Sequence, residues 1–159
     1  MSNDDNRSQL ALTMISTLPK WGSWAASMRE VDTPYGRIGY RQASVMWILR
    51  RDQQNRKDSM TTAIALEIGV QNSVITRASE HLEQLGLIKR TTASEDRRRQ
   101  YLTLTTNGVK ASEYIEALYT NAIESELNSL SQGDIENLAD GIETLNMLIT
   151  KIAAKPLGS

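Results

Sequence analysis

Cysteine is absent from this chain of 159 residues. The absence excludes disulfide bonds, thiol-based redox sensing and metal sites with cysteine ligands. Histidine occurs only once, as His81, which leaves a carboxylate-rich site as the remaining alternative for zinc. We therefore expect no metal and no cofactor. We also expect His81 to be a half-exposed surface residue rather than a proton switch.

Phenylalanine and long apolar runs are absent as well. No run reaches the roughly 18 apolar residues that indicate a membrane-spanning helix. Residues 1–5 are acidic and lack the apolar core of a signal peptide. These absences predict a cytoplasmic protein with no membrane partner. Candidate acids, bases and nucleophiles do not cluster, and no glycine-rich phosphate loop is present, so the sequence does not indicate an enzyme.

Charge is distributed unevenly along the chain, although the net charge is only −1. Residues 41–110 carry twelve basic and seven acidic side chains, whereas residues 111–159 carry two basic and eight acidic ones. A basic segment joined to an acidic one is typical of a nucleic-acid-facing module on a separate scaffold.

The stretch from 59 to 105 predicts a helix, a tight turn, a second helix, and two strands joined by a basic turn. Ser59 is expected to cap the first helix, and Gly69 is expected to end it in a left-handed conformation. The second helix carries apolar residues at steps of four, four and three: Val74, Ala78, Leu82 and Leu85. This spacing predicts one buried stripe, and Gly86 follows as the end of the helix.

The exposed positions near the start of the second helix carry short hydrogen-bonding groups and one cation: Asn72, Ser73, Thr76 and Arg77. A helix end placed in the major groove of DNA needs such groups to reach base edges and phosphates. A solvated helix face would show the same residues, so the helix alone leaves both interpretations open.

The basic turn between the two strands favours the DNA interpretation. Its tip holds Asp96 followed by Arg97, Arg98 and Arg99, and adjacent like charges repel one another unless they contact an anion. Asp96 lies two residues before Arg98 and can hold its guanidinium in one orientation. A two-stranded arm with an oriented arginine at its tip suits the minor groove, whose negative potential attracts arginine.

Together these residues resemble the winged helix-turn-helix of the MarR family of bacterial transcription regulators. The wing pattern of that family is matched by Asp96, Arg98, Leu102, Leu104 and Thr105. Its recognition-helix pattern is matched by Gly69, Val70, Ser73, Thr76, Arg77, Leu82, Glu83, Gly86 and Leu87. Ile75 replaces a valine, and Gln71 stands where the family usually has a serine cap. So many matches at fixed spacing are far more specific than one short motif.

The segments that precede this stretch are expected to be mostly helical. Residues 1–7 are expected to be disordered, and Pro19 must start, kink or break the helix around it. Two helical pieces joined at Leu18-Pro19 are one alternative. We expect a turn at residues 33–36, a helix at residues 41–53 and a polar loop at residues 53–58.

Two further helices are expected after the second strand, where Asn107-Gly108 forms a turn or a loose first turn. The last helix repeats apolar residues at steps of three and four: Ile135, Leu138, Ile142, Leu145, Ile149 and Ile152. Such a heptad seam needs a partner helix, and an intramolecular partner is the simple alternative. We expect a homodimer built from the helices of 8–30 and 107–153, as the resemblance also implies.

Bulky apolar residues and an arginine form one more candidate set: Trp21, Trp24, Met28, Trp47 and Arg51. The simplest interpretation is core packing in a chain that lacks phenylalanine. The alternative is a ligand pocket, because MarR-family members often bind small aromatic or phenolic acids between the dimer helices and the DNA-binding lobe. Tryptophan rings and a guanidinium suit such an anion.

The sequence therefore predicts a mainly α fold, with a single domain over 1–159 in which a winged helix-turn-helix lobe at 41–105 joins the dimerisation helices. The resemblance implies a homodimeric repressor that binds double-stranded DNA at a pseudo-palindromic operator and is released by a small aromatic or phenolic effector, with activation as the alternative mode of regulation. The alternative is a winged-helix module that binds protein without specific DNA binding. The wing arginines and Thr76-Arg77 argue against that alternative.

Overall fold

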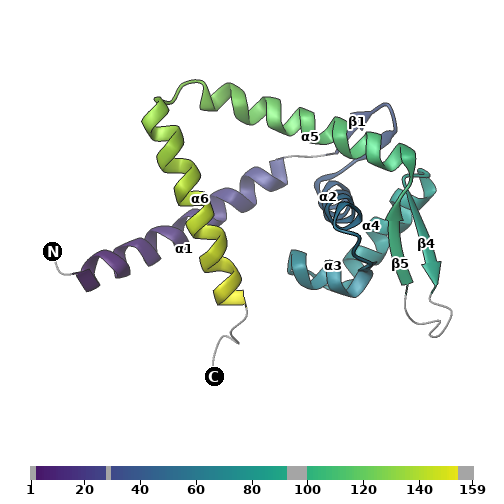
Figure 1. Ribbon diagram of the computed structural model, residues 1–159, viewed down its shortest axis with the longest axis horizontal. Helices are drawn as coiled ribbons and strands as arrows, with labels where there is room; N and C mark the ends of the chain where they lie inside the picture. Colours follow the sequence, from purple (N-terminus) through teal and green to yellow (C-terminus); the bar gives the residue numbers. More distant parts are fainter. Residues whose placement is uncertain (1–2, 28–29, 93–99, 154–159) are drawn as a thin grey trace. The chain divides into compact units, whose positions relative to one another are not determined.

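Figure 1 shows the computed structural model, which describes residues 3–27, 30–92 and 100–153. Its helices are α1 (Asn3–Ser27), α2 (Tyr40–Gln54), α3 (Thr61–Ile68), α4 (Asn72–Gln84), α5 (Thr106–Leu127) and α6 (Gln132–Ala153). Its strands are β1 (Val31–Thr33), β2 (Gly36–Ile38), β3 (Ser59–Met60), β4 (Ile88–Thr92) and β5 (Gln100–Leu104). The prediction of a mainly α winged helix-turn-helix fold is confirmed. The chain divides into two compact units, residues 1–115 and 116–159.

The core of the first unit lies among α2, α3, α4 and a small antiparallel sheet (Figure 1). The sheet has the order β3-β5-β4, with Ile88 opposite Leu104 and Thr92 opposite Gln100. Its largest fully buried side chains include Val45, Met46, Leu49, Ile64, Ile75, Leu82, Leu87 and Leu102. Burial of each such side chain is worth about 1.5–3 kcal/mol, so this cluster fixes α4 against the rest of the lobe.

The turn between α3 and α4 begins with the predicted left-handed glycine. Gly69 adopts a φ of 73°, and the amide of Val70 donates to the carbonyl of Ala65 at 3.0 Å. A left-handed glycine at a helix end lets the chain reverse at little steric cost. Only residues 69–71 separate the two helices, so α4 must leave α3 at a sharp angle.

Two details of this region were predicted wrongly. Ser59 does not cap α3, because it lies in β3 and donates instead to Asp52 Oδ2 at 2.7 Å, while Met60 holds the cap position. Val74 does not lie in the buried stripe of α4 and is 37% exposed. The buried positions of α4 are Ile75, Ala78, Ser79 and Leu82. These positions are three, one and three residues apart, so the buried face is shifted by about one residue from the predicted stripe.

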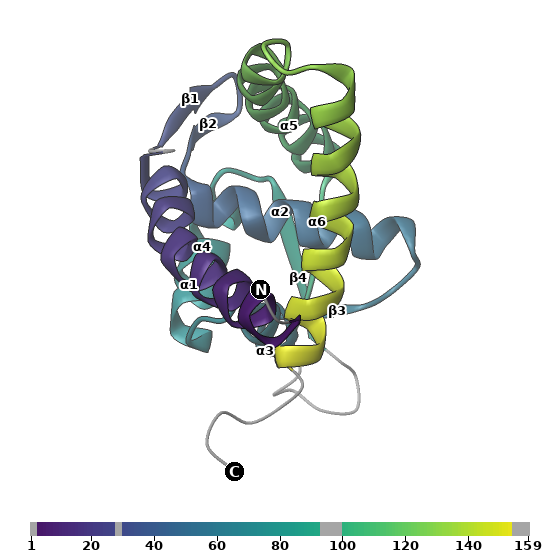
Figure 2. The same cartoon turned by 90° about the vertical axis from the view of Figure 1, so that its left-hand side faces the viewer.

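The segment before the lobe also departs from expectation. α1 is helical from Asn3, where disorder was predicted up to residue 7, and one helix contains Pro19. A proline inside a helix removes one hydrogen bond and crowds the preceding turn, yet it need not end the helix. The predicted turn at 33–36 closes a short hairpin, visible in Figure 2, in which Val31 pairs with Ile38. These strands were not predicted, since each has only three residues.

α5 begins at Thr106, so Asn107-Gly108 forms its first turn, as one of the two alternatives held. Thr105 caps this end, because its hydroxyl accepts from the amide of Gly108 at 3.0 Å and donates to the carbonyl of Gly86 at 2.8 Å. Gly108 is buried, and a Cβ there would lie 1.9 Å from the carbonyl oxygen of Leu87. The start of α5 therefore packs against the backbone that leads into β4.

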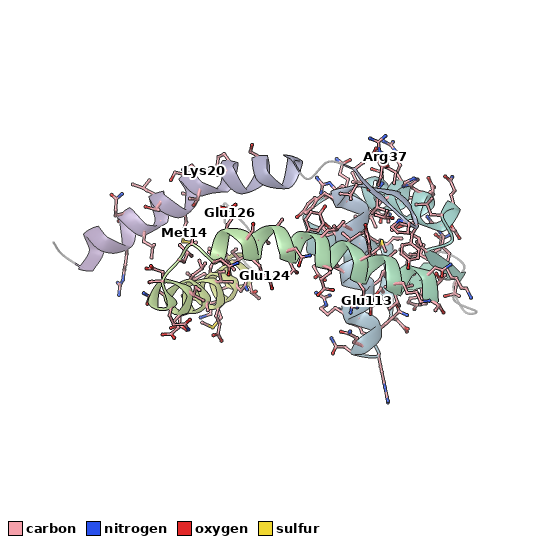
Figure 3. All side chains as sticks on the ribbon, turned by 90° about the horizontal axis from the view of Figure 1, so that it is seen from above. Met14, Lys20, Arg37, Glu113, Glu124 and Glu126 are labelled. Carbon is pink, nitrogen blue, oxygen red and sulfur yellow. The ribbon has the colours of Figure 1, made fainter. Side chains whose placement is uncertain are left out.

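A salt bridge joins the same part of α5 to α2. The guanidinium of Arg50 donates to Glu113, labelled in Figure 3, at 3.2 Å. The Arg50 side chain is 24% exposed, so the pair is less screened by water than one on the open surface. It adds a polar contact to the buried packing of Ala111 and Ile115.

The second unit consists of the remainder of α5, a short turn and α6 (Figure 2). Ser131 caps α6 as predicted: its hydroxyl accepts from the amide of Asp134 at 3.2 Å and donates to the Asp134 carboxylate at 2.6 Å. The predicted seam runs along α6 with much of its apolar surface open. Leu138, Ile142, Ile149 and Ile152 are between 42% and 51% exposed.

Candidate nucleic-acid interface

The predicted groove-reading residues lie together on the outer side of α4. Asn72, Ser73 and Arg77 are exposed, and Thr76 is half-buried. Positions three and four apart share a face of a helix, so these four residues form one polar patch at the start of α4. The hydroxyl of Thr76 donates to the carbonyl of Asn72 at 3.0 Å, which holds it near the helix surface. Gln71 occupies the cap position and makes no side-chain capping bond.

The opposite side of α4 anchors this patch. Ile75 and Leu82 are fully buried, and the hydroxyl of the buried Ser79 donates to the carbonyl of Ile75 at 2.7 Å. The serine thus satisfies its own polarity within the helix and can face the core. His81 is half-buried as expected, and its Nδ1 lies 3.3 Å from the amide nitrogen of Gln42 on α2.

The wing strands lie beside α4, as Figure 1 shows. β4 and β5 pair through five residues each, and Leu102 and Leu104 are buried while Tyr101 and Thr103 are half-buried. The predicted alternation of the second strand is therefore confirmed. The tip residues Asp96, Arg97, Arg98 and Arg99 lie outside the described residues.

Arg90 on β4 is a polar residue of this region that the sequence analysis did not single out. Its guanidinium donates to Glu83 Oε2 at 2.8 Å, to Gln100 Oε1 at 3.1 Å and to the carbonyl of Thr76 at 3.3 Å. One side chain thus contacts α4 twice and β5 once. The sequence contained a signal for its inward position: Arg90 lies two residues after Ile88, so the two side chains lie on the same face of the strand.

A second polar cluster joins α2, α3 and β3. The guanidinium of Arg51 donates to both carboxylate oxygens of Glu67 and to Asp52, and the hydroxyl of Ser59 donates to Asp52. Burial alone would raise the pKa of Asp52, but the hydrogen bonds from Arg51 and Ser59 outweigh it, so this pKa lies below the ordinary value. The hydrogen bond from Arg51 likewise lowers the pKa of Glu67, and these bonds raise the pKa of Arg51.

Residues 40–99 match the model of the MarR family. These residues form a MarR-family domain. The matched range contains α2, β3, α3, α4 and β4. It includes the polar patch of α4 and Arg90, whereas Gln100, the contact of Arg90 on β5, lies just outside it. The resemblance inferred from the motifs is thereby confirmed.

Solved structures share the fold over most of the chain. The transcriptional regulator BldR of Sulfolobus solfataricus is 20% identical, with 95% of this chain and 99% of that chain covered and a TM-score of 0.69. FabT of Streptococcus pneumoniae, solved in complex with DNA, is 19% identical, with 92% and 98% covered and a TM-score of 0.60. PcaV of Streptomyces coelicolor, solved with its natural ligand, is 17% identical, with 84% and 89% covered and a TM-score of 0.59.

The candidate ligand residues are placed only in part. Trp47 is half-buried on α2 of the MarR domain. Trp21 and Trp24 belong to α1, but their side chains lie outside the described residues, as does Met28. Arg51 is engaged by Glu67 and Asp52, so an anionic ligand would have to displace these carboxylates. Because three of the five side chains lie outside the described residues, the ligand pocket stays a prediction.

Histidine and acidic side chains of the described part do not gather into a group of three that could hold a metal ion. Among helices of the described part, none is both long and apolar enough to cross a membrane.

Proposed function

We propose that this chain is a DNA-binding transcription regulator that inserts α4 into the major groove. The observation that carries this proposal is the polar patch of α4, held outward by the buried Ile75 and Leu82 beside a paired wing. Asn72 suits adenine, and Arg77 suits guanine or phosphate. The complex of FabT with DNA, a chain of the same fold, supports the same use of the lobe here.

The wing would extend this contact beyond the major groove. β4 and β5 bring the two ends of the segment 93–99 together opposite each other, at Thr92 and Gln100. That segment contains Asp96 and three adjacent arginines. Arginine is attracted to the narrow minor groove because the potential there is negative, so the wing would bind the groove next to the one read by α4.

The regulator is proposed to act as a homodimer. α6 leaves an apolar seam about half exposed over four of its residues, and α5 leaves Leu118 and Ile123 at 38% and 42% exposure. An apolar helix face of this extent indicates a partner. Two-fold pairing would set two α4 helices on one side of the dimer, separated by about one DNA turn of roughly 34 Å or a multiple of it. The expected target is a pseudo-palindromic operator.

Repression and release complete the proposal. A dimer bound over a promoter would repress by blocking access to it. The complex of PcaV with its natural ligand supports a small effector, for which an aromatic or phenolic acid is the expected class. Trp47 is the described residue best suited to stack on such a ring.

The decisive experiment selects bound sequences from a random DNA pool and then measures affinity for the selected site and for shuffled DNA. Affinity for the selected site should be higher, and each phosphate contact should add about −0.9 to the slope of log affinity against log salt. Equal affinity for both DNAs at low salt would contradict the proposal and favour a protein-binding module.

The role of the α4 patch is tested with Arg77→Ala and Thr76→Ala. A lost base contact costs about 1–3 kcal/mol of discrimination, so both variants should change which bases are preferred. Arg77→Lys serves as the control, because it keeps the charge but loses the planar fork. If each variant keeps the wild-type base preference and binds every DNA more weakly, these residues contact phosphate alone.

A further inference from the structure

Arg90 is placed to connect the two parts of the proposed DNA-binding surface. It lies on β4 opposite Leu102, on the face of the strand that Ile88 buries. Its side chain is only 16% exposed. Lys89, the next residue along the strand, is exposed. Two neighbouring cations therefore have different surroundings, and only Lys89 is free to face a DNA phosphate.

The contacts of Arg90 span α4 and the wing. Glu83, at 2.8 Å, lies near the end of α4, and the carbonyl of Thr76, at 3.3 Å, belongs to a residue of the polar patch, next to Arg77. Gln100, at 3.1 Å, is the first residue of β5. Because Gln100 directly follows the segment 93–99, Arg90 connects the base of the wing tip to the part of α4 that would read the groove.

The chemistry of these contacts requires arginine. A guanidinium carries five N–H donors in a fixed plane, so it can donate to three acceptors at once and hold them at fixed angles. The ammonium group of a lysine is a single point on a flexible chain and cannot reproduce that plane. The carboxylate of Glu83 also neutralises the charge of Arg90, so this residue is poorly suited to bind phosphate itself.

We propose that Arg90 is a positioning residue, which fixes α4 relative to the wing strands and thereby sets how well the lobe discriminates between DNA sequences. The proposal rests on the proposed function, since it assigns a role within the same DNA-binding surface. Base contacts depend on geometry far more than phosphate contacts do. A small rotation of α4 therefore lowers discrimination while the long-range attraction to DNA remains.

The test compares three variants with the same two DNAs, the selected site and its shuffled form. Arg90→Gln and Lys89→Gln each remove one positive charge from adjacent residues of β4, and Arg90→Lys keeps the charge but removes the fork. All affinities are measured well below the unfolding temperature of each variant, so that loss of folded protein does not contribute.

Both Arg90 variants should lower the ratio of the two affinities by about tenfold or more, the effect of one well-placed base contact, with the salt slope unchanged. Lys89→Gln should keep the ratio and, if Lys89 meets a phosphate, reduce the magnitude of the slope by about 0.9. The proposal is overturned if Arg90→Lys keeps the wild-type ratio. It is equally overturned if Arg90→Gln reduces the slope and leaves the ratio alone, because Arg90 would then contact phosphate directly.

A measurement without DNA separates this proposal from the proposed function. The chain has no cysteine, so Ser73→Cys on α4 and Thr91→Cys on β4 provide the only two labelling sites in each chain, and an excess of unlabelled chain confines the label pair to one protomer of a dimer. The distribution of distances between the labels should be broader in the Arg90→Lys background than in the wild-type background. An unchanged distribution overturns the positioning role. A wild-type protein that does not discriminate between the two DNAs contradicts the proposed function instead.

Discussion

Replacing Gly108 by alanine tests how the start of α5 is seated on the lobe. The added Cβ would lie 1.9 Å from the carbonyl oxygen of Leu87, 2.9 Å from its carbonyl carbon and 3.1 Å from Leu104 Cδ2. Cβ atoms essentially never approach another heavy atom within 3.0 Å. The first turn of α5 must therefore move by more than about 1 Å away from the backbone of Leu87.

That movement removes hydrogen bonds that hold the site together. The carbonyl of Leu87 accepts from the amide of Thr105 at 2.9 Å and from its hydroxyl at 3.3 Å. A displacement of about 1 Å takes both distances beyond the hydrogen-bonding range. Two lost bonds at about 1 kcal/mol each, together with a buried carbonyl left without a partner and strain in the packing, amount to about 3–5 kcal/mol.

Thermal and urea unfolding, followed by circular dichroism, measure this cost. Gly108→Ala should lower the melting temperature by about 6–20 °C. Gly133→Ala is the matched control: this glycine is also in the first turn of a helix, but beyond its chain neighbours and its own helix backbone nothing lies within 4 Å of its added Cβ. It should be neutral or slightly stabilising. If the two variants differ by less than about 1 kcal/mol, the close approach at Gly108 does not hold the helix.

Three other predictions concern charge and assembly. The pKa of Asp52 is lowered in the folded lobe, so its contribution to stability is present above a pH of about 4 and declines as the pH falls below that. Asp52→Asn should therefore lower the free energy of unfolding by about 1–3 kcal/mol at pH 7 and make it depend less on pH on the acid side. An unchanged dependence of stability on pH would contradict this. Arg98→Ala and Asp96→Ala should each weaken DNA binding without lowering the melting temperature, and wild-type affinity of both at near-physiological salt would refute the wing assignment. The double variant Ile142→Glu with Ile149→Glu should lose dimerisation and operator binding together, because it buries unpaired charge at the seam. Sedimentation and DNA binding are measured on the same sample, and a folded monomer with wild-type operator affinity would contradict both the dimer and its geometry.

Local pattern was enough to predict the helix-turn-helix and the wing strands. Gly69 ends α3 in a left-handed conformation, and Leu102 and Leu104 alternate as in a half-buried strand. These features depend on residues close together in the chain, so a spacing of two or of three and four residues carries the information. The capping pair of Ser131 and Asp134 was predicted for the same reason.

The errors arose where the partner lies on another element of the fold. Ser59 has a side chain suited to a helix cap, but Asp52 on α2 takes its hydroxyl. β3 has two residues and exists because β5 pairs with it. The rotation of α4 that buries Ile75 rather than Val74 is set by the elements packed against it. Because both positions carry apolar residues, the sequence did not decide which of the two faces the core.

The sequence by itself indicated the resemblance to the MarR family, the polar patch of α4 and the apolar seam of α6, because each depends on residues at short, regular spacing. Only the tertiary structure decided which arginines are engaged. Arg51 and Arg90 look like available cations in the sequence, yet carboxylates on other elements hold both. The reason is physical: the charge of a side chain is a property of the residue, whereas its availability depends on the groups that folding brings within hydrogen-bonding distance.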